Sequence, residues 1–226
     1  MAQPWKIISS ITTNEGLLEL RQRGERDFLI TIGTQVLMNS LSNRSEVMLG
    51  KLGCSHLKER CAPRVLIGGL GMGCTLGAAL GCLPGTAKVV VAELNPIVFE
   101  WCQGPLAILT DSAVTDLRVH IEIGDVVDLI SRIAGSGDDE RFDAIIIDLY
   151  RGPHARTDPE KDPFYGMRAI HNYKAALMPD GVLAVWGESS DEGFKLRLQS
   201  AGFSVSTERP GRGGLRHVVF LARKAP

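Results

Sequence analysis

The sequence predicts an α/β protein built on a mostly parallel sheet that is covered by helices on both faces. From Val65 onward, apolar runs of strand length alternate with helix-like segments, as in consecutive strand–helix–strand units. Several of these runs are rich in valine and isoleucine, which is typical of central strands buried on both faces. Residues 1–64 lack this alternation and carry turn residues at short intervals, so we expect a small antiparallel meander there.

The main sheet is expected to have seven strands. In chain order they are 64–68, 88–94, 118–124, 142–149, 182–187, 203–208 and 216–223. The helices between them are expected at 74–83, 96–109, 126–134, 164–181 and 191–202. Pro96 suits the first turn of its helix. Only residues 209–214 separate the last two strands, so these strands should pair antiparallel and the last strand should oppose the others.

The first 64 residues divide at turn signals. Arg23–Gly24 and Gly33 break residues 16–40 into short alternating runs, and residues 45–57 are predicted to form a helix that leads into the main domain. We therefore place the meander and the start of the linking helix in 1–50, and the α/β domain in 51–226.

Composition and charge exclude several function classes. The net charge is −1 in 226 residues, which gives no sign of a nucleic-acid or membrane partner. No run approaches the roughly 18 apolar residues of a membrane span, and the first ten residues lack a signal peptide's apolar region, so we expect a cytoplasmic protein. Five cysteines without CxxC spacing indicate free thiols. A zinc site at 54–61 is the weaker alternative, and we expect no metal.

A glycine-rich turn follows the first central strand. Gly68, Gly69, Gly71 and Gly73 lie between an apolar strand and a helix of small residues. Glycine permits positive φ angles and close approach of a ligand, and the following helix directs free N–H groups at that ligand. The spacing fits GxGxG, which is associated with S-adenosylmethionine (SAM) sites, rather than the GxGxxG dinucleotide fingerprint. Residues 51–226 are therefore expected to be a SAM-binding catalytic domain. The alternative is a turn that only permits close packing of the helix on the strand.

Acidic residues end the next three strands. Glu93 ends the second strand, where a carboxylate can accept hydrogen bonds from both ribose hydroxyls. Asp125 follows Gly124 and can accept from an adenine amino group or cap the helix that begins at Val126. Asp148 ends the buried fourth strand, at the edge of the sheet where ligands bind. Together these strand ends predict an adenosyl site with a candidate proton acceptor beside it.

The segments 65–73, 89–96, 119–130, 142–153 and 176–188 resemble the successive motifs of the spermidine synthase-like branch of the class I SAM-dependent methyltransferase superfamily. The resemblance implies a Rossmann-like fold, a transferase activity and a homodimer. It also implies that the proton-accepting aspartate is Asp148. The cofactor-binding candidates are Gly68, Gly69, Gly71, Gly73, Glu93, Leu94, Gly124, Asp125, Val126 and Asp148.

Two positions depart from the family's pattern. Aminopropyltransferases of this family resemble one another in a GGGDGG turn, whose aspartate holds the amine end of decarboxylated SAM, whereas GGLGMG places Gly71 there. They also carry a DSSDP-like loop whose second aspartate grips the polyamine. Arg151 stands at that point here and would repel a cationic polyamine. The charges of 151–168 and of the chain after Glu208 are neutral to basic, whereas a polyamine site should be acidic.

These departures favour a SAM-dependent methyltransferase that acts on a small-molecule acceptor. The catalytic candidates are Asp148, which would orient or deprotonate the acceptor, and Tyr150, which would line its pocket. Arg151 and His154 are candidates for contact with an anionic or aromatic acceptor. The alternative is a polyamine aminopropyltransferase that uses decarboxylated SAM. A third hypothesis is a non-enzymatic binder of adenosyl compounds. The meander is expected to be a lid over the pocket or a contact in the homodimer.

Overall fold

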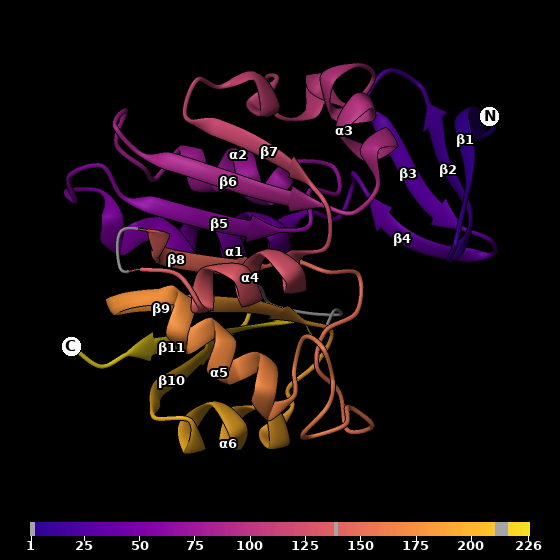
Figure 1. The fold of residues 1–226 in the computed structure, drawn as a ribbon. Coiled ribbons are helices and arrows are strands. Elements are labelled where there is room, and N and C mark those ends of the chain that lie inside the picture. The colour runs from indigo at the N-terminus through magenta and orange to yellow at the C-terminus, as the bar shows by residue number, and fades with distance from the viewer. Residues whose placement is uncertain (1–2, 138–139, 211–216) are drawn as a thin grey trace.

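The computed structural model describes residues 3–137, 140–210 and 217–226 and divides their strands between two sheets. Within this described part, the main sheet has seven strands in the order β10-β11-β9-β8-β5-β6-β7 (Figure 1). These strands are β5 (Arg64–Gly68), β6 (Lys88–Glu93), β7 (Val119–Ile123), β8 (Phe142–Ile147), β9 (Leu177–Gly187), β10 (Phe203–Glu208) and β11 (Val218–Lys224). The strand β11 pairs antiparallel with β9 and β10, as predicted for the last strand.

Helices cover both faces of this sheet, as the alternating pattern predicts. The side chains of α1 (Arg44–Cys54), α2 (Cys74–Leu80) and α3 (Pro96–Gln103) pack on one face, in one apolar cluster with the N-terminal sheet. The side chains of α4 (Val126–Ala134), α5 (Met167–Ala176) and α6 (Glu192–Ser200) pack on the other face. No helix among the described residues is long and apolar enough to cross a membrane.

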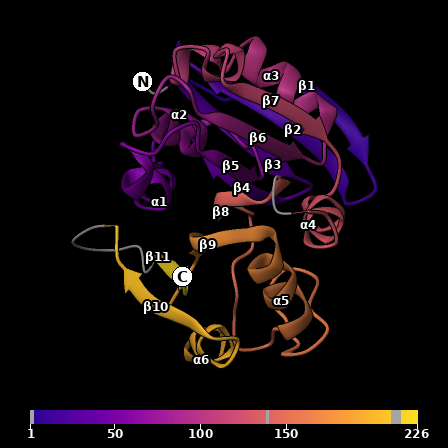
Figure 2. The same cartoon turned by 60° about the vertical axis from the view of Figure 1, so that its left-hand side comes forward.

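The N-terminal segment forms the predicted meander. Its strands are β1 (Lys6–Thr13), β2 (Gly16–Arg23), β3 (Asp27–Ile32) and β4 (Gln35–Asn39), and each pairs antiparallel with the next. Gly24 and Gly33 adopt positive φ angles at the predicted turns. The meander lies beside α3 at the end of the main sheet where β5 to β8 finish (Figures 1 and 2). Helix α1 then runs without a break across the predicted boundary between residues 1–50 and 51–226.

Four of the predicted helices are shorter than the sequence indicates. The helices predicted over 74–83 and 191–202 are trimmed to Cys74–Leu80 and Glu192–Ser200, and two others differ more. The helix predicted over 164–181 begins at Met167 and ends at Ala176, because Leu177 is already extended and pairs with β8. Residues 178–181 form an irregularity within β9, where Asp180 has a positive φ angle, so the proline–glycine signal marks a strand bulge rather than the helix end. The helix predicted over 96–109 ends at Gln103, before Gly104. The connection 209–214 lies mostly outside the described residues.

Candidate functional site

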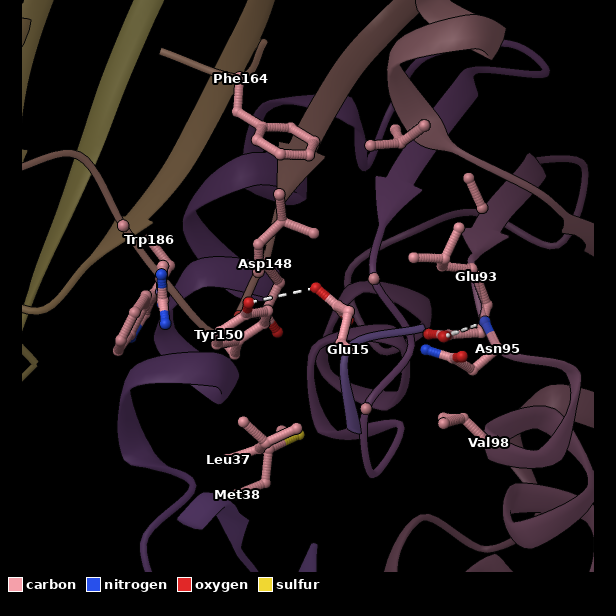
Figure 3. Close-up of a pocket in the computed structure, with 18 of the residues that line it drawn as sticks. Glu15, Leu37, Met38, Glu93, Asn95, Val98, Asp148, Tyr150, Phe164 and Trp186 are labelled. Carbon is pink, nitrogen blue, oxygen red and sulfur yellow. Dashed lines mark hydrogen bonds between the residues drawn. The ribbon is translucent and has the colours of Figure 1, made fainter. Parts of the chain in front are cut away.

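A cavity of about 420 Å³ opens at the carboxyl ends of the parallel strands, beneath the N-terminal sheet. This position is the switch point of the sheet: β6 and β7 lie to one side of β5, and β8 and β9 lie to the other. The volume lies in the range of about 300–1,000 Å³ that is typical of small-molecule sites. Figure 3 shows side chains from both sheets converging on this space.

Most of the predicted site residues line this one cavity. The structure brings together Gly69, Gly71, Glu93, Leu94, Gly124, Asp125, Val126, Asp148, Tyr150, Arg151 and His154. The cavity wall does not include Gly68 and Gly73. A Cβ at Gly68 would lie 2.8 Å from Cγ2 of Val126, so this glycine serves packing of α4 on β5. Gly73, in the left-handed conformation, is the N-cap residue of α2.

The glycine turn is held by bonds to both neighbouring strands. Gly69 donates to the carbonyl of Ala92, and Asp148 donates through its N–H to the carbonyl of Gly68. Gly69 and Gly71 have φ angles of +90° and +52°. A Cβ at Gly69 would overlap the carbonyl oxygen of Asp148, so close packing as well as backbone conformation requires glycine there.

Gly71 faces a side chain that comes from the N-terminal sheet. A Cβ at this position would overlap Sδ of Met38 and lie 2.8 Å from its Cε. The φ of Gly71 is one that aspartate adopts more readily than most residues. The thioether of Met38, in β4, therefore occupies the space that an aspartate side chain at position 71 would enter.

Glu93 is buried at the end of β6, with its carboxylate beside the glycine turn. Its Oε2 accepts from the Leu70 N–H and its Oε1 from the Asn95 N–H, both at 2.9 Å. Burial raises the pKa of Glu93, and these backbone N–H groups oppose the rise. The backbone N–H groups of Gly71 and Leu94 also act on this carboxylate, so a ligand hydroxyl would share its oxygens with backbone donors.

Asp125 caps helix α4, which was one of its two predicted roles. Its Oδ1 accepts from the Val127 N–H at 2.8 Å. The side chain is exposed and lines the cavity, so Oδ2 retains acceptor capacity for a ligand. Leu94, on the same wall, is 55% exposed and offers an apolar surface beside Glu93.

Asp148 follows β8 and lies at the centre of the cavity edge. Its Oδ2 accepts from the hydroxyl of Thr75 at 2.5 Å. Burial raises the pKa of Asp148 to about 7, the Thr75 hydrogen bond opposes the rise, and the Glu46 carboxylate adds to it. A carboxyl group with a pKa near neutrality can take up and release a proton at physiological pH.

Tyr150 reaches across the mouth of the cavity toward the N-terminal sheet. Its hydroxyl donates to Oε1 of Glu15, in the β1–β2 turn, at 3.3 Å (Figure 3). Partial burial and the Glu15 carboxylate raise the pKa of Tyr150, so its hydroxyl stays protonated at neutral pH. Residues of the meander therefore form part of the cavity wall, while its role as a lid or as a dimer contact stays a prediction.

Arg151 and His154 lie on the loop that follows Tyr150 and are both exposed. The Arg151 guanidinium stacks over the Tyr150 ring, 5.3 Å from its centroid. The Nδ1 of His154 accepts from the Arg156 N–H at 3.1 Å. Both residues are available to a bound acceptor at the edge of the cavity.

The cavity wall is more acidic than the sequence predicts. Its basic side chains are Arg151 and His154. Its carboxyl groups belong to Glu15, Glu46, Glu93, Asp125, Asp148 and Asp162. The expectation of neutral to basic surroundings was wrong, because it assumed that all charged side chains of the loop 151–168 face the cavity. In that loop the other basic side chains, Arg156, Lys161 and Arg168, are exposed and absent from the cavity lining, whereas Asp162 lines it.

Several wall residues were not singled out from the sequence. The N-terminal sheet contributes Leu18, Ile30, Ile32, Leu37 and Met38, and the main domain contributes Phe164, Tyr165 and Trp186. The alternating pattern of residues 16–40 predicts an apolar face but not what that face covers. Within the described part of the chain, no cluster of three or more His, Cys, Asp and Glu residues could hold a metal ion. Cys54 is buried and Cys61 exposed.

Comparisons with known proteins bear on the fold. No family model and no curated protein matches the chain. A spermidine synthase from Thermotoga maritima matches with a TM-score of 0.68 and 20% identity, over 96% of this chain and 72% of that one. A spermidine synthase in complex with the transition-state analogue AdoDATO matches with a TM-score of 0.68 and 18% identity, over the same shares.

A methyltransferase matches as well. Human methyltransferase-like protein 13 in complex with SAH gives a TM-score of 0.60 and 20% identity, over 81% of this chain and 82% of that one. The chain thus has the Rossmann-like fold that spermidine synthases share with SAM-dependent methyltransferases, as the sequence motifs predict. Identities this low concern the fold alone.

Proposed function

We propose that this protein is a SAM-dependent methyltransferase that acts on a small-molecule acceptor. The observation that carries the proposal is the place of Met38 against Gly71. A turn built this way lacks the carboxylate that would hold the amine end of decarboxylated SAM, and the flexible side chain of Met38 fills the space beside it.

The strand ends fit an adenosyl compound. The Glu93 carboxylate lies on the cavity wall at the end of β6, where ribose hydroxyls would reach it. Asp125 has a free oxygen for an adenine amino group, and Leu94 offers an apolar surface. Gly69 and Gly71 keep the wall of the cradle free of side chains. Two of the matching structures hold adenosyl ligands, SAH and AdoDATO, which supports the same class of ligand here.

Asp148 is the residue that we assign to proton transfer. When bound, the cofactor supplies an electrophilic methyl group on its sulfonium. The acceptor must then lose a proton as its nitrogen or oxygen gains the methyl group, and Asp148 stands at the cavity edge with a pKa of about 7. General-base catalysis of this kind typically contributes about 10²–10⁴-fold in rate.

The acidic wall favours an amine as the acceptor. Glu15, Glu46 and Asp162 surround the space beside Asp148, while the Arg151 charge is directed onto the Tyr150 ring at the rim. Carboxylates attract a cationic amine into the cavity. The same observation supports a second candidate function, an aminopropyltransferase that uses decarboxylated SAM on an unusual amine.

Ligand binding separates the two candidates. We expect SAM and SAH to raise the melting temperature of the purified protein more than decarboxylated SAM and methylthioadenosine do, each at the same concentration. The stabilisation follows RT ln(1 + [L]/Kd), so the size of each shift ranks the affinities. Stabilisation by the decarboxylated pair alone would overturn the methyltransferase in favour of the aminopropyltransferase.

We also propose that the protein is a homodimer. The face of the meander opposite the cavity carries Ile7, Leu17 and Val36, which are 56%, 45% and 53% exposed. Exposed apolar surface of this kind is often covered by a partner. Sedimentation at working concentration should give the mass of two chains, and a monomer throughout would count against the dimer.

A further inference from the structure

The side chain of Thr75 connects the candidate base to the first turn of another helix. Thr75 is the second residue of α2 and is 1% exposed. Its Oγ1 lies 2.5 Å from Oδ2 of Asp148 and 3.2 Å from the backbone carbonyl oxygen of Glu46, in α1. The hydroxyl thus stands between an ionisable group and a fixed acceptor.

Close packing holds these three groups in place. A Cβ at Gly50 would overlap the carbonyl oxygen of Thr75, so α1 and α2 approach each other more closely than any other residue there would allow. A Cβ at Gly53, one turn further along α1, would lie 2.8 Å from Cδ1 of Ile146 in β8. The side chain of threonine is also stiff at χ1. The hydroxyl position is therefore determined by α1, α2 and β8 together.

The groups that face Asp148 do not supply a positive charge. Glu46 of α1 adds a like charge, and Cys74 of α2 is a thiol whose own pKa is raised to about 11 by burial. Tyr165, from the loop after β8, stays protonated because burial raises its pKa. At the rim, the Arg151 guanidinium stacks on Tyr150, whose hydroxyl donates to Glu15. No ion pair among the described residues includes Asp148.

We propose that Thr75 is a positioning residue for Asp148: its hydroxyl, fixed by α1 and α2, keeps the carboxylate ionised and oriented toward the acceptor. The inference rests on the proposed function in so far as Asp148 is the base. The contribution of Thr75 is to stabilise the carboxylate where burial and Glu46 both disfavour it.

The same hydroxyl can satisfy both protonation states. While Asp148 is ionised, the Thr75 O–H donates to Oδ2. When the proton resides on Oδ2, the carboxyl O–H donates to Oγ1, and the Thr75 proton turns to the Glu46 carbonyl. Neither state leaves the partly buried carboxyl group without a partner, so uptake and release of the proton need no movement of the backbone.

Substitution of Thr75 tests the proposal on the protein without cofactor or acceptor. Carbon-13 NMR of aspartate carboxyl groups gives the titration midpoint of Asp148, and Asp148→Asn identifies its signal. In Thr75→Val, which keeps the shape but lacks the hydroxyl, we expect the midpoint to rise by about one to two pH units, as for loss of a hydrogen bond to a charged group. Thr75→Ser should keep the wild-type midpoint to within about half a unit.

Two outcomes overturn the proposal: a wild-type midpoint in Thr75→Val, or a shift in Thr75→Ser as large as in Thr75→Val. If Thr75→Val does not fold, Thr75→Ala takes its place. The thermal-shift comparison above tests the function separately. If the protein binds no adenosyl compound but the Asp148 midpoint shifts in Thr75→Val, the methyltransferase proposal fails and the role of Thr75 stands. If SAM binds but the Asp148 midpoint does not shift in Thr75→Val, the role of Thr75 fails and the proposed function stands.

Discussion

The two halves of the cavity are built in different ways. The half at β5, β6 and β7 consists of strand ends and the turns that follow them: the glycine turn, Glu93 and Asp125. The half at β8 and β9 gathers Asp148 and Tyr150 with side chains from distant parts of the chain, such as Glu15 and Glu46. The first half uses backbone geometry to hold a ligand shared by many proteins. The second depends on tertiary packing, and it is the half that determines which acceptor enters.

The largest effect that separates the halves is expected at Asp148. The variant Asp148→Asn keeps the shape but cannot accept a proton, so turnover on a responsive amine from a panel should fall about 10²–10⁴-fold. Turnover is measured as the rate at which S-adenosylhomocysteine is released. The matched control is Asp128→Asn, an exposed carboxylate of α4, which should keep wild-type turnover. Equal rates for Asp148→Asn and wild type would remove Asp148 from the chemistry.

The same variant should change how stability depends on pH. Because the pKa of Asp148 is raised from 3.8 to about 7, this group favours the folded state below pH 4 and loses that contribution as pH rises through 7. Asparagine has no such dependence. The free energy of unfolding of wild type, relative to Asp148→Asn, should therefore fall by up to about 4 kcal/mol between pH 4 and pH 8. The free energies come from urea unfolding at each pH. The same pH dependence in both proteins would contradict the raised pKa of Asp148.

A smaller effect is expected where the halves meet, at Gly71 and Met38. An aspartate at position 71 should destabilise the protein by about 1 kcal/mol, because a side chain is strained at the φ of +52° and the thioether of Met38 must move aside. Removal of the thioether by Met38→Ala should relieve that clash, so the double variant should lose less stability than the two single variants combined. Strictly additive losses in a double-mutant cycle would show that Met38 does not keep position 71 free of side chains.

The smallest effect is expected at Asp125, which the sequence left between two roles. Asp125→Ala removes the cap of α4 and should cost about 1 kcal/mol, whereas Asp125→Ser keeps a capping hydroxyl and should cost little. Both variants lose the longer carboxylate, so both should bind S-adenosylhomocysteine up to about tenfold more weakly. If Asp125→Ser binds S-adenosylhomocysteine as tightly as the wild type does, Asp125 only caps the helix and does not bind the ligand.

The sequence predicts the first half well because its determinants are local. Strand periodicity locates β5, β6 and β7, and the residues that follow each strand must meet at one edge of a parallel sheet. The second half could be predicted only in part. Asp148 follows from the same rule, but Glu15, Glu46 and Met38 reach the cavity through the docking of the meander and α1.

The error about charge has the same origin. Arg156 and Lys161 stand close to Arg151 in the sequence but are exposed and absent from the cavity lining, whereas carboxylates far apart in the chain converge on it. The role proposed for Thr75 was out of reach for a similar reason. Its hydroxyl meets Asp148 across 73 positions of the chain, and a threonine in the first turn of a helix gives no signal of that contact.

The most direct test of the account is the affinity for S-adenosylhomocysteine, measured by calorimetry on one variant from each half. Glu93→Gln loses the carboxylate proposed to hold the ribose, so the dissociation constant should rise about 10- to 100-fold. Asp148→Asn should bind within about threefold of wild type, because Asp148 is assigned to the acceptor's proton. Loss of affinity in Asp148→Asn as large as in Glu93→Gln, or no binding by the wild type, would contradict the division of the cavity into these two halves.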